Sequence, residues 1–360
     1  MTIDRKHIEV PRGLATAAAY SWRLLVIGAA AVVLVYVLVA LRLVFIPVFV
    51  ALLASTLLVP VANALRRRRV PSLLATWITM LGAIGIFAGA IYVIAPQVAD
   101  QFDDIAEEVR TGAEDVITWL TEGPLDLTRA EIEGYLDQAG EALRARQDDL
   151  VSGAFKGAYL VIEGITGFIL TLVLLFFFIK DGERISNAFL GLFKGERRED
   201  VREIASRSWT ALGAYIRGTA IVGVVDAIFI GAGLLIMGVP LVLPLAIITF
   251  FAAFFPLVGA VIAGIIATLV ALVTKGFLAA AVIAGVTIAV QQIEGDVLQP
   301  IVLGRAVNLH PLVILLSLTA GAIVAGIAGA FLAVPVAALT TVVVGYFRAK
   351  ERPPPQDVVA

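Results

Sequence analysis

Apolar residues occur along the chain in long runs that contain few or no charged side chains. Eight such runs lie at residues 24–41, 43–65, 72–95, 158–179, 218–238, 241–272, 276–290 and 312–347. Together they make up more than half of the 360 residues. Because about 18 to 20 consecutive apolar residues are enough for a helix to cross a bilayer, the pattern predicts an all-α polytopic membrane protein with about eight transmembrane helices.

The overall composition supports this fold class and excludes several kinds of chemistry. Apolar residues make up 60% of the chain, charged residues only 16%, and the mean hydropathy is +0.97. A soluble domain carries about 25% charged residues. The chain has no Cys and two His, so we expect no metal site, no cofactor and no disulfide. It also lacks the GxxxxGK[ST] phosphate-binding loop of ATPases.

The distribution of Lys and Arg predicts how the protein sits in the membrane. Basic residues concentrate in segment 1–23, at Arg66–Arg69 and in segment 180–217, whereas segment 97–157 has fifteen acidic residues against five basic ones. Since cytoplasmic loops are enriched in Lys and Arg, we expect both termini in the cytoplasm. The net charge is −2 and the basic residues flank apolar spans, which argues against nucleic-acid binding.

These boundaries divide the chain into segments with different expected roles. They are a cytoplasmic N-terminal segment (1–23), the first three spans (24–95), an extracytoplasmic helical hairpin (96–157), the fourth span (158–179), a cytoplasmic charged segment (180–217), a transport core with broken membrane helices (218–347) and a disordered cytoplasmic tail (348–360). The hairpin is predicted from two apolar helical stripes, which could pack on each other or against another subunit. The pattern alone leaves a self-packed hairpin and a homo-oligomer equally open.

Two of the apolar runs are too long for a single span. As straight helices, residues 241–272 and 312–347 would measure about 48 and 54 Å, well beyond the roughly 30 Å of hydrocarbon. Pro and Gly residues interrupt both runs, and the expected helix breaks are Pro256, Gly259, Gly326 and Gly329. Each run is either a kinked, tilted span or a re-entrant hairpin. Broken helices at membrane depth are typical of transporter binding sites.

One acidic residue lies in the middle of an apolar run. Asp226 falls within 218–238, where an ionised carboxylate costs at least ~2.5 kcal/mol unless it is paired or hydrated. Thr219 and Gly223 share its helical face, so a neighbouring helix could approach there. Asp226 is a candidate functional residue, with a bonded packing residue as the alternative.

A second polar group follows the short run 276–290. The run needs more residues to span, so its helix should continue through Gln291, Gln292 and Glu294 and place them near membrane depth, with Asp296 close behind. Such a cluster can bind a cation, accept a proton, hydrogen-bond a polar solute, or simply cap the helix at the interface. The candidate polar partners for substrate or for the acids are Arg217, Gln291, Gln292, Arg305 and His310, with a structural cap before Pro311 as the alternative for His310.

Several motifs together resemble the autoinducer-2 exporter (AI-2E) family of permeases. They lie in the expected order at Phe176–Arg184, Tyr215–Gly218, Phe254–Gly259, Gln291–Gly304 and Asn308–Leu312. The resemblance covers residues 20 to 350. It implies a multi-pass, homo-oligomeric protein of the bacterial inner membrane. The activities assigned to the family include export of autoinducer-2 and exchange of sodium or lithium for protons. Asp296 stands where Asn is common in the family, which makes the cluster more acidic.

The residues and the resemblance together predict a secondary transporter that is not an enzyme and has no catalytic residues. We expect it to export a small polar solute such as autoinducer-2 by alternating access, with Asp226, Glu294 and Asp296 as coupling carboxylates. One alternative is a sodium(lithium)/proton antiporter, and another is a membrane scaffold that acts through its extracytoplasmic helices. An intramembrane aspartyl protease using Asp226 and Asp296 is disfavoured, because the sequence contexts of its two aspartates are missing.

Overall fold

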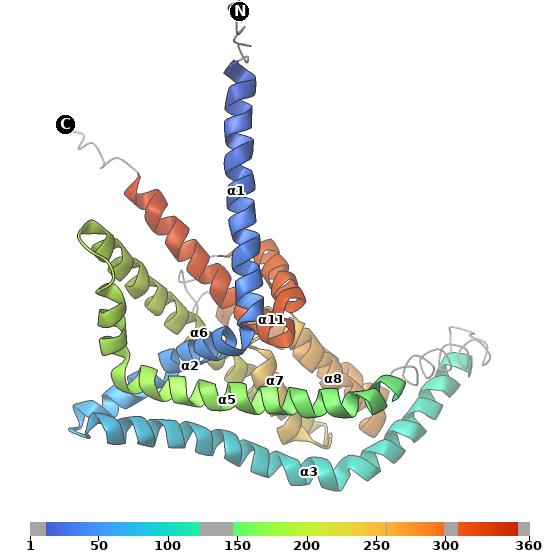
Figure 1. The fold of residues 1–360 in the computed structure, drawn as a ribbon. Coiled ribbons are helices and arrows are strands. Elements are labelled where there is room, and N and C mark those ends of the chain that lie inside the picture. The colour runs from blue at the N-terminus through green and yellow to red at the C-terminus, as the bar shows by residue number, and fades with distance from the viewer. Residues whose placement is uncertain (1–11, 123–146, 257, 299–308, 352–360) are drawn as a thin grey trace, which may run out of the picture.

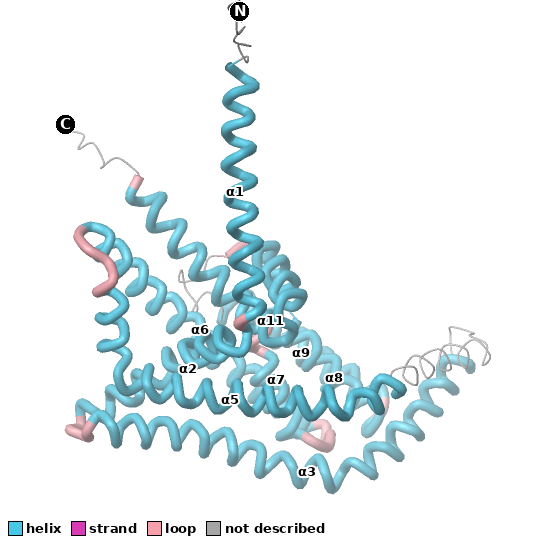
Figure 2. The backbone as a smooth tube through the Cα atoms, in the orientation of Figure 1, coloured by secondary structure: helices cyan, strands magenta, loops and turns pink. Residues whose placement is uncertain are grey.

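The computed structural model describes residues 12–122, 147–256, 258–298 and 309–351, and this part of the chain is helical throughout, without strands (Figures 1 and 2). The elements are α1 (Arg12–Ala40), α2 (Arg42–Arg67), α3 (Ser72–Glu122), α5 (Gln147–Leu190), α6 (Glu196–Ile236), α7 (Val242–Ala252), α8 (Val258–Lys275), α9 (Phe277–Ile293), the π-helical turn η1 (Glu294–Leu298) and α11 (Pro311–Lys350). Arg305 and the middle of the expected extracytoplasmic hairpin lie outside the described residues.

The predicted fold class is confirmed. Within the described residues, eight helices are long and apolar enough to cross a membrane. Many large apolar side chains remain on the surface, including Ile86 at 79% exposure and Ile323 at 81%. A water-soluble protein rarely exposes so much contiguous apolar surface, whereas hydrocarbon solvates it without cost.

Helices α2 and α5 lie side by side and are tied together at both ends. At one end Arg42 forms an ion pair with Glu163 at 3.2 Å. At the other end the Arg66 guanidinium donates to the carbonyl oxygen of Ile179 at 2.7 Å. The two helices therefore run in the same direction, and the second contact marks what we call the arginine-rich side of the bundle, where Arg66–Arg69 lie.

Three helices run beyond the apolar segments that contain their membrane spans. Helix α3 continues through Pro96 to Glu122, because proline at this position bends a helix without ending it (Figure 1). Helix α5 continues past residue 179 to Leu190, with a kink at Asp181 (φ −120°, ψ 17°). Helix α6 starts at Glu196 and is continuous to Ile236. The charged segment after the fourth span thus consists mainly of extensions of membrane helices.

The first overlong run folds back on itself. Helix α7 is only 11 residues long, about 16 Å, and cannot cross the bilayer. It runs antiparallel to α6: a Cβ on Gly231 would contact Ala246, and one on Gly223 would contact the Phe250 carbonyl. Helix α8 then returns until Lys275 lies beside Gly238, at the end of α6. Helices α7 and α8 form a re-entrant hairpin that opens on the side opposite the arginine-rich side.

The second overlong run forms a hairpin of the opposite orientation. Helix α11 is broken at Ala325 and at Gly326, whose φ of +61° and ψ of −144° are accessible mainly to glycine. Its two arms then pack so closely that a Cβ on Gly321 or Gly329 would collide with the backbone carbonyl of the other. The second arm ends at Lys350, which contacts Asp200 of α6 on the arginine-rich side. The structure thus favours hairpins over kinked spans in both runs.

Helix α1 is the exception to the packed bundle. It extends away from the other helices in Figure 1, and nearly all of its described side chains are exposed. Tyr20 and Trp22, for example, are 62% and 69% exposed. Its apolar surface must therefore be covered by lipid or protein rather than by the rest of this chain.

Candidate functional site

Asp226 is buried in the interior of the bundle on α6. Its exposure is 4%, and its Oδ1 atom has no hydrogen-bond partner among the described residues. One turn earlier, Gly223 lets the backbone of α7 come close, because a Cβ there would lie 2.8 Å from the Phe250 carbonyl oxygen. The prediction that a neighbouring helix approaches this face at Gly223 is confirmed. Asp226 therefore lies beside the end of the α7–α8 hairpin that is buried in the bundle.

A second carboxyl group, that of Glu294 after α9, lies within electrostatic range of Asp226. Helix α9 packs against α6 where Ile283 and Val286 contact the surface at Gly233. It continues past Gln291 and Gln292, as predicted, to Ile293 and then into η1. Glu294, the first residue of η1, is half-buried and interacts electrostatically with Asp226. Single π-helical turns are rare and occur frequently at functional sites.

Two like charges in a region of low dielectric repel strongly. Coulomb repulsion grows as the local dielectric falls, and burial also removes the water that would solvate an ionised Asp226. The state with both carboxylates ionised and nothing bound is therefore unfavourable. A proton or a monovalent cation bound at either carboxylate would relieve the repulsion. No cluster of three or more metal-ligating side chains occurs in the described part of the chain.

The other polar residues of the cluster differ in exposure. Asp296 and Gln292, four residues apart, are exposed, whereas Gln291 is half-buried like Glu294, three residues later. The two pairs thus lie on two neighbouring sides of the chain, as helical spacing requires. Asp226 is buried while Asp296 is exposed, so nothing in the structure pairs the two aspartates as a protease would require.

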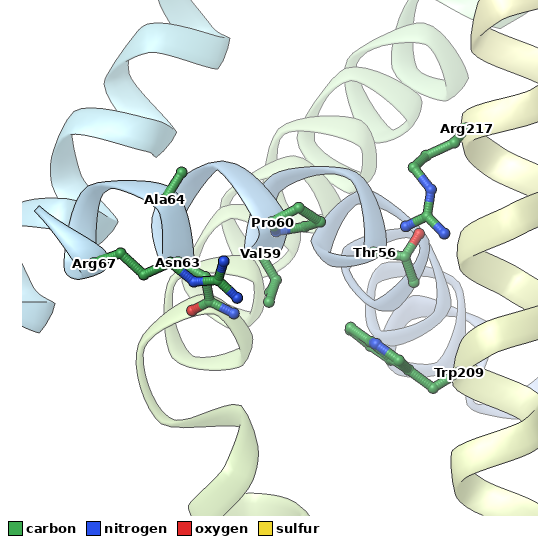
Figure 3. Close-up of a pocket in the computed structure, with 8 residues that line it drawn as sticks. All are labelled: Thr56, Val59, Pro60, Asn63, Ala64, Arg67, Trp209 and Arg217. Carbon is green, nitrogen blue, oxygen red and sulfur yellow. The ribbon is translucent and has the colours of Figure 1, made fainter.

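Arg217 points away from the carboxylates. Its side chain is exposed and folds back along α6, over Gly213, where an added Cβ would lie 3.1 Å from the guanidinium. It lines a cavity between α2 and α6 together with Arg67 (Figure 3). Arg217 and Asp226 thus lie on different faces of the helix, as their spacing of nine residues predicts.

His310 has a structural role in the described chain. It is the N-cap of α11, and its Nδ1 accepts a hydrogen bond from the amide of Leu312 at 3.2 Å. Pro311 follows at the first helical position, where a missing amide costs nothing. This arrangement accounts for the His-Pro pair without any contact to a ligand.

The four expected helix breaks occupy different places in the hairpins. Pro256 lies in the turn between α7 and α8. Gly259 is in the first turn of α8, where a Cβ would collide with the Ala252 carbonyl. Gly326 is at the break in α11. Gly329 is helical and provides the close contact with Gly321. Proline and glycine therefore mark the turns and the contacts that close them.

An aromatic contact that sequence reasoning missed joins the two hairpins. The rings of Phe254 and Phe255, in the turn after α7, lie 6.3 and 5.9 Å from the ring of Phe331 on α11. Phe250, which contacts Gly223 near Asp226, packs edge-to-face against Phe254 at 5.7 Å. The run Phe254-Phe255-Pro256 is visible in the sequence, but nothing in the sequence distinguishes Phe331 from the other apolar residues of α11 as its partner.

Most of the chain is similar in sequence to known transport proteins. The AI-2E family transporter profile matches residues 24–349. The chain is 40% identical over 321 residues to "Putative transport protein MT0215" of Mycobacterium tuberculosis, covering 89% of this chain and 88% of that protein. It is 27% identical over 318 residues to "Putative transport protein YrrI" of Bacillus subtilis, covering 84% and 86%. It is 28% identical over 227 residues to "Putative permease PerM" of Escherichia coli K12, covering 59% and 61%. The chain therefore belongs to the AI-2E family of transporters.

Proposed function

We propose that the protein is a secondary transporter of the bacterial inner membrane that exports a small polar solute, such as autoinducer-2, in exchange for protons or cations. The observation that carries the proposal is the buried Asp226, whose Oδ1 lacks a partner and which lies within electrostatic reach of Glu294. A buried carboxylate is costly in a membrane and is retained for function. In this proposal Asp226 and Glu294 bind the coupling ion, and the exposed Asp296 exchanges that ion with water.

The two oppositely oriented hairpins provide a means of alternating access. The α7–α8 hairpin enters from one side and the α11 hairpin from the other, and they meet where Phe254 and Phe255 contact Phe331. Opening this contact on one side at a time would expose the carboxylates to each compartment in turn. Gln291 and Gln292, which precede Glu294, supply hydrogen-bonding groups for a polar solute, with Arg305 as a further candidate.

A second candidate function is sodium(lithium)/proton exchange. The carboxylate pair itself favours it, because Asp226 has no cationic partner within the described residues and two carboxylates are suitable ligands for a small monovalent cation. The same two groups would then bind either a proton or a cation. This makes the identity of the exported species the main difference between the two candidates.

Ion flux in proteoliposomes tests the coupling. Sodium-dependent proton movement is measured for the wild type, Asp226→Asn and Glu294→Gln, with Glu183→Gln as a control that removes an exposed carboxylate on α5. Loss of flux in both site variants but not in the control supports cation/proton exchange. If wild-type protein shows no sodium effect, export of polar metabolites driven by a proton gradient is measured in the same vesicles. Unchanged transport in the Asp226→Asn and Glu294→Gln double variant would refute carboxylate coupling.

We also propose that both termini are cytoplasmic and that the protein forms a homo-oligomer. The positive-inside rule supports the orientation, since Arg66–Arg69 and Lys350 lie on the same side of the bundle, where Lys350 contacts Asp200. The uncovered α1 supports self-association. Deleting residues 100–150 separates transport from a scaffold role, because a scaffold loses its activity when its extracytoplasmic helices are removed, whereas the transport core retains ion binding.

A further inference from the structure

The cavity between α2 and α6 lies apart from the carboxylate pair and differs from it in charge. It has a volume of about 410 Å³ and lies on the arginine-rich side of the bundle. Its charged residues are Arg67, from the last turn of α2, and Arg217, from α6, and none of the residues lining it is acidic. Figure 3 shows the two arginine side chains reaching toward the cavity from opposite directions.

Neither arginine is neutralised within the described chain. No ion pair joins Arg67 or Arg217 to an acidic side chain there, whereas other basic residues on the same side are paired: Lys350 with Asp200, and Arg207 with Glu203. The adjacent Arg66 is used structurally, through its bonds to Asn63 and to the Ile179 carbonyl. Arg67 and Arg217 are thus two guanidinium groups that are available to an anion.

The rest of the cavity wall is mainly apolar. Val59, Pro60 and Ala64 of α2 form one wall, and the indole of Trp209 on α6 lies opposite (Figure 3). Trp209 is 40% exposed, which is consistent with the membrane interface, where tryptophan is enriched. A fully hydrated small anion would make no use of this wall. A ligand with an anionic head and a hydrocarbon tail would use both parts.

We propose that this cavity binds the phosphate group of an anionic phospholipid, with its acyl chains along the apolar wall and Trp209. Guanidinium groups bind phosphate through paired, charge-assisted hydrogen bonds. Basic pockets between membrane helices on the cytoplasmic side bind the head groups of such lipids. The lipid would join α2 to α6 and so link the α2–α5 pair to the helix that carries Asp226.

Gly213 bears on the position of the Arg217 side chain. It leaves room for the Arg217 guanidinium to lie along α6, because a Cβ at this position would be 3.1 Å from one guanidinium nitrogen and 3.3 Å from the other. An added methyl group would require the exposed Arg217 guanidinium to shift by only a few tenths of an ångström, so Gly213 allows this position of the side chain without being essential to it.

Native mass spectrometry of the purified full-length protein tests the proposal. The probes are phosphatidylglycerol, phosphatidylcholine with the same acyl chains, and soluble glycerol phosphate. We expect wild type to prefer phosphatidylglycerol, and we expect Arg67→Gln with Arg217→Gln to weaken its binding about tenfold or more. Arg68→Gln with Arg69→Gln is the matched control, because it removes two charges at the same end of α2 without altering the cavity lining.

A second measurement locates the lipid. Phosphatidylglycerol brominated on its acyl chains should quench tryptophan fluorescence in wild type, and the part of that quenching lost in Trp209→Phe reports on this cavity. Helix content and the unfolding temperature show whether each variant is folded. Equal phosphatidylglycerol binding by wild type and the Arg67/Arg217 variant would overturn the proposal. Glycerol phosphate binding as tight as that of the lipid would overturn the lipid assignment and identify a free phosphate compound as the ligand.

Discussion

The carboxyl groups of Asp226 on α6 and Glu294 in η1 interact electrostatically, although they belong to different helices. Such an arrangement costs stability, because Asp226 is 4% exposed and one of its oxygens is unpartnered. The first prediction follows from this relationship.

Asp226→Asn is expected to abolish coupled transport while leaving the protein as stable as wild type or more stable, because it removes a buried charge and its repulsion by Glu294. A gain of about 1 kcal/mol would raise the unfolding temperature by roughly 1–2 °C in a chain of this size. Thermal unfolding in detergent and flux in proteoliposomes are measured on the same preparation. A marked loss of stability would instead indicate that Asp226 holds the fold together.

The closure of the α7–α8 hairpin depends on the absence of a side chain at Gly259. A Cβ there meets the backbone of Ala252, which cannot move as a flexible side chain could, so Gly259→Ala should destabilise the protein by about 1–3 kcal/mol. Gly285→Ala in α9 is the control, because an added Cβ there meets nothing within 4 Å and alanine favours the helix. Equal unfolding temperatures for the two variants would contradict the hairpin geometry.

The aromatic contact between the hairpins should behave as a gate. The chain has no Cys, so thiols can be introduced without removing native ones. We expect a short bifunctional thiol reagent to join Phe255→Cys to Phe331→Cys, to stop transport, and to release it again on reduction. Each single cysteine variant treated with the reagent is the control. Full transport by the crosslinked protein would show that the hairpins need not separate.

On the arginine-rich side, the ends of α6 and α11 are held together by Asp200. Lys350 donates to both of its carboxylate oxygens, at 2.7 and 2.8 Å, and the Tyr346 hydroxyl donates to one of them. The hydrogen bond from Lys350, followed by that from Tyr346, lowers the pKa of Asp200 below 3.8, and the hydrogen bond to Asp200 raises the pKa of Lys350 above 10.5.

The sign of the pH dependence follows from these two shifts. The lowered pKa of Asp200 gives a contribution that is present above pH 3.8 and lost as the pH falls below it. The raised pKa of Lys350 gives one that is present below pH 10.5 and lost above it. Spin labels on Arg197→Cys and Arg348→Cys should report a constant distance from about pH 5 to 9 and a broader one in acid. Asp200→Asn should broaden the distribution already at neutral pH, and an unchanged distribution in that variant would show that other contacts hold the helix.

Part of the site could be predicted because its determinants are local. A carboxylate inside an apolar run is visible wherever it occurs, so Asp226 was identifiable, and the Gly223 spacing correctly indicated a close helix approach. The continuation of α9 through Gln291 and Gln292 followed from the length needed to cross a bilayer. The His310-Pro311 helix start was likewise legible as a cap.

Other features depend on contacts between distant segments. The proximity of Asp226 to Glu294 requires α9 to pack along α6, and the contact of Phe255 with Phe331 requires two hairpins to meet. The exposure of Gln292 and Asp296 and the half-burial of Gln291 and Glu294, by contrast, follow their spacing along the helix.

The sequence by itself determined the helical membrane fold, two of the four expected breaks (Pro256 and Gly326, whereas Gly259 and Gly329 are helical) and the presence of an acid in an apolar run, because hydrocarbon demands long apolar helices and penalises charge wherever it occurs. Only the tertiary structure decided that both overlong runs turn back, that Glu294 lies within electrostatic range of Asp226, and that Arg217 lines a separate cavity with Arg67. The physical reason is that lipid and protein interior are equally apolar. In a membrane protein the hydrophobic pattern therefore marks what lies in the membrane, but not which face of each helix packs against which neighbour.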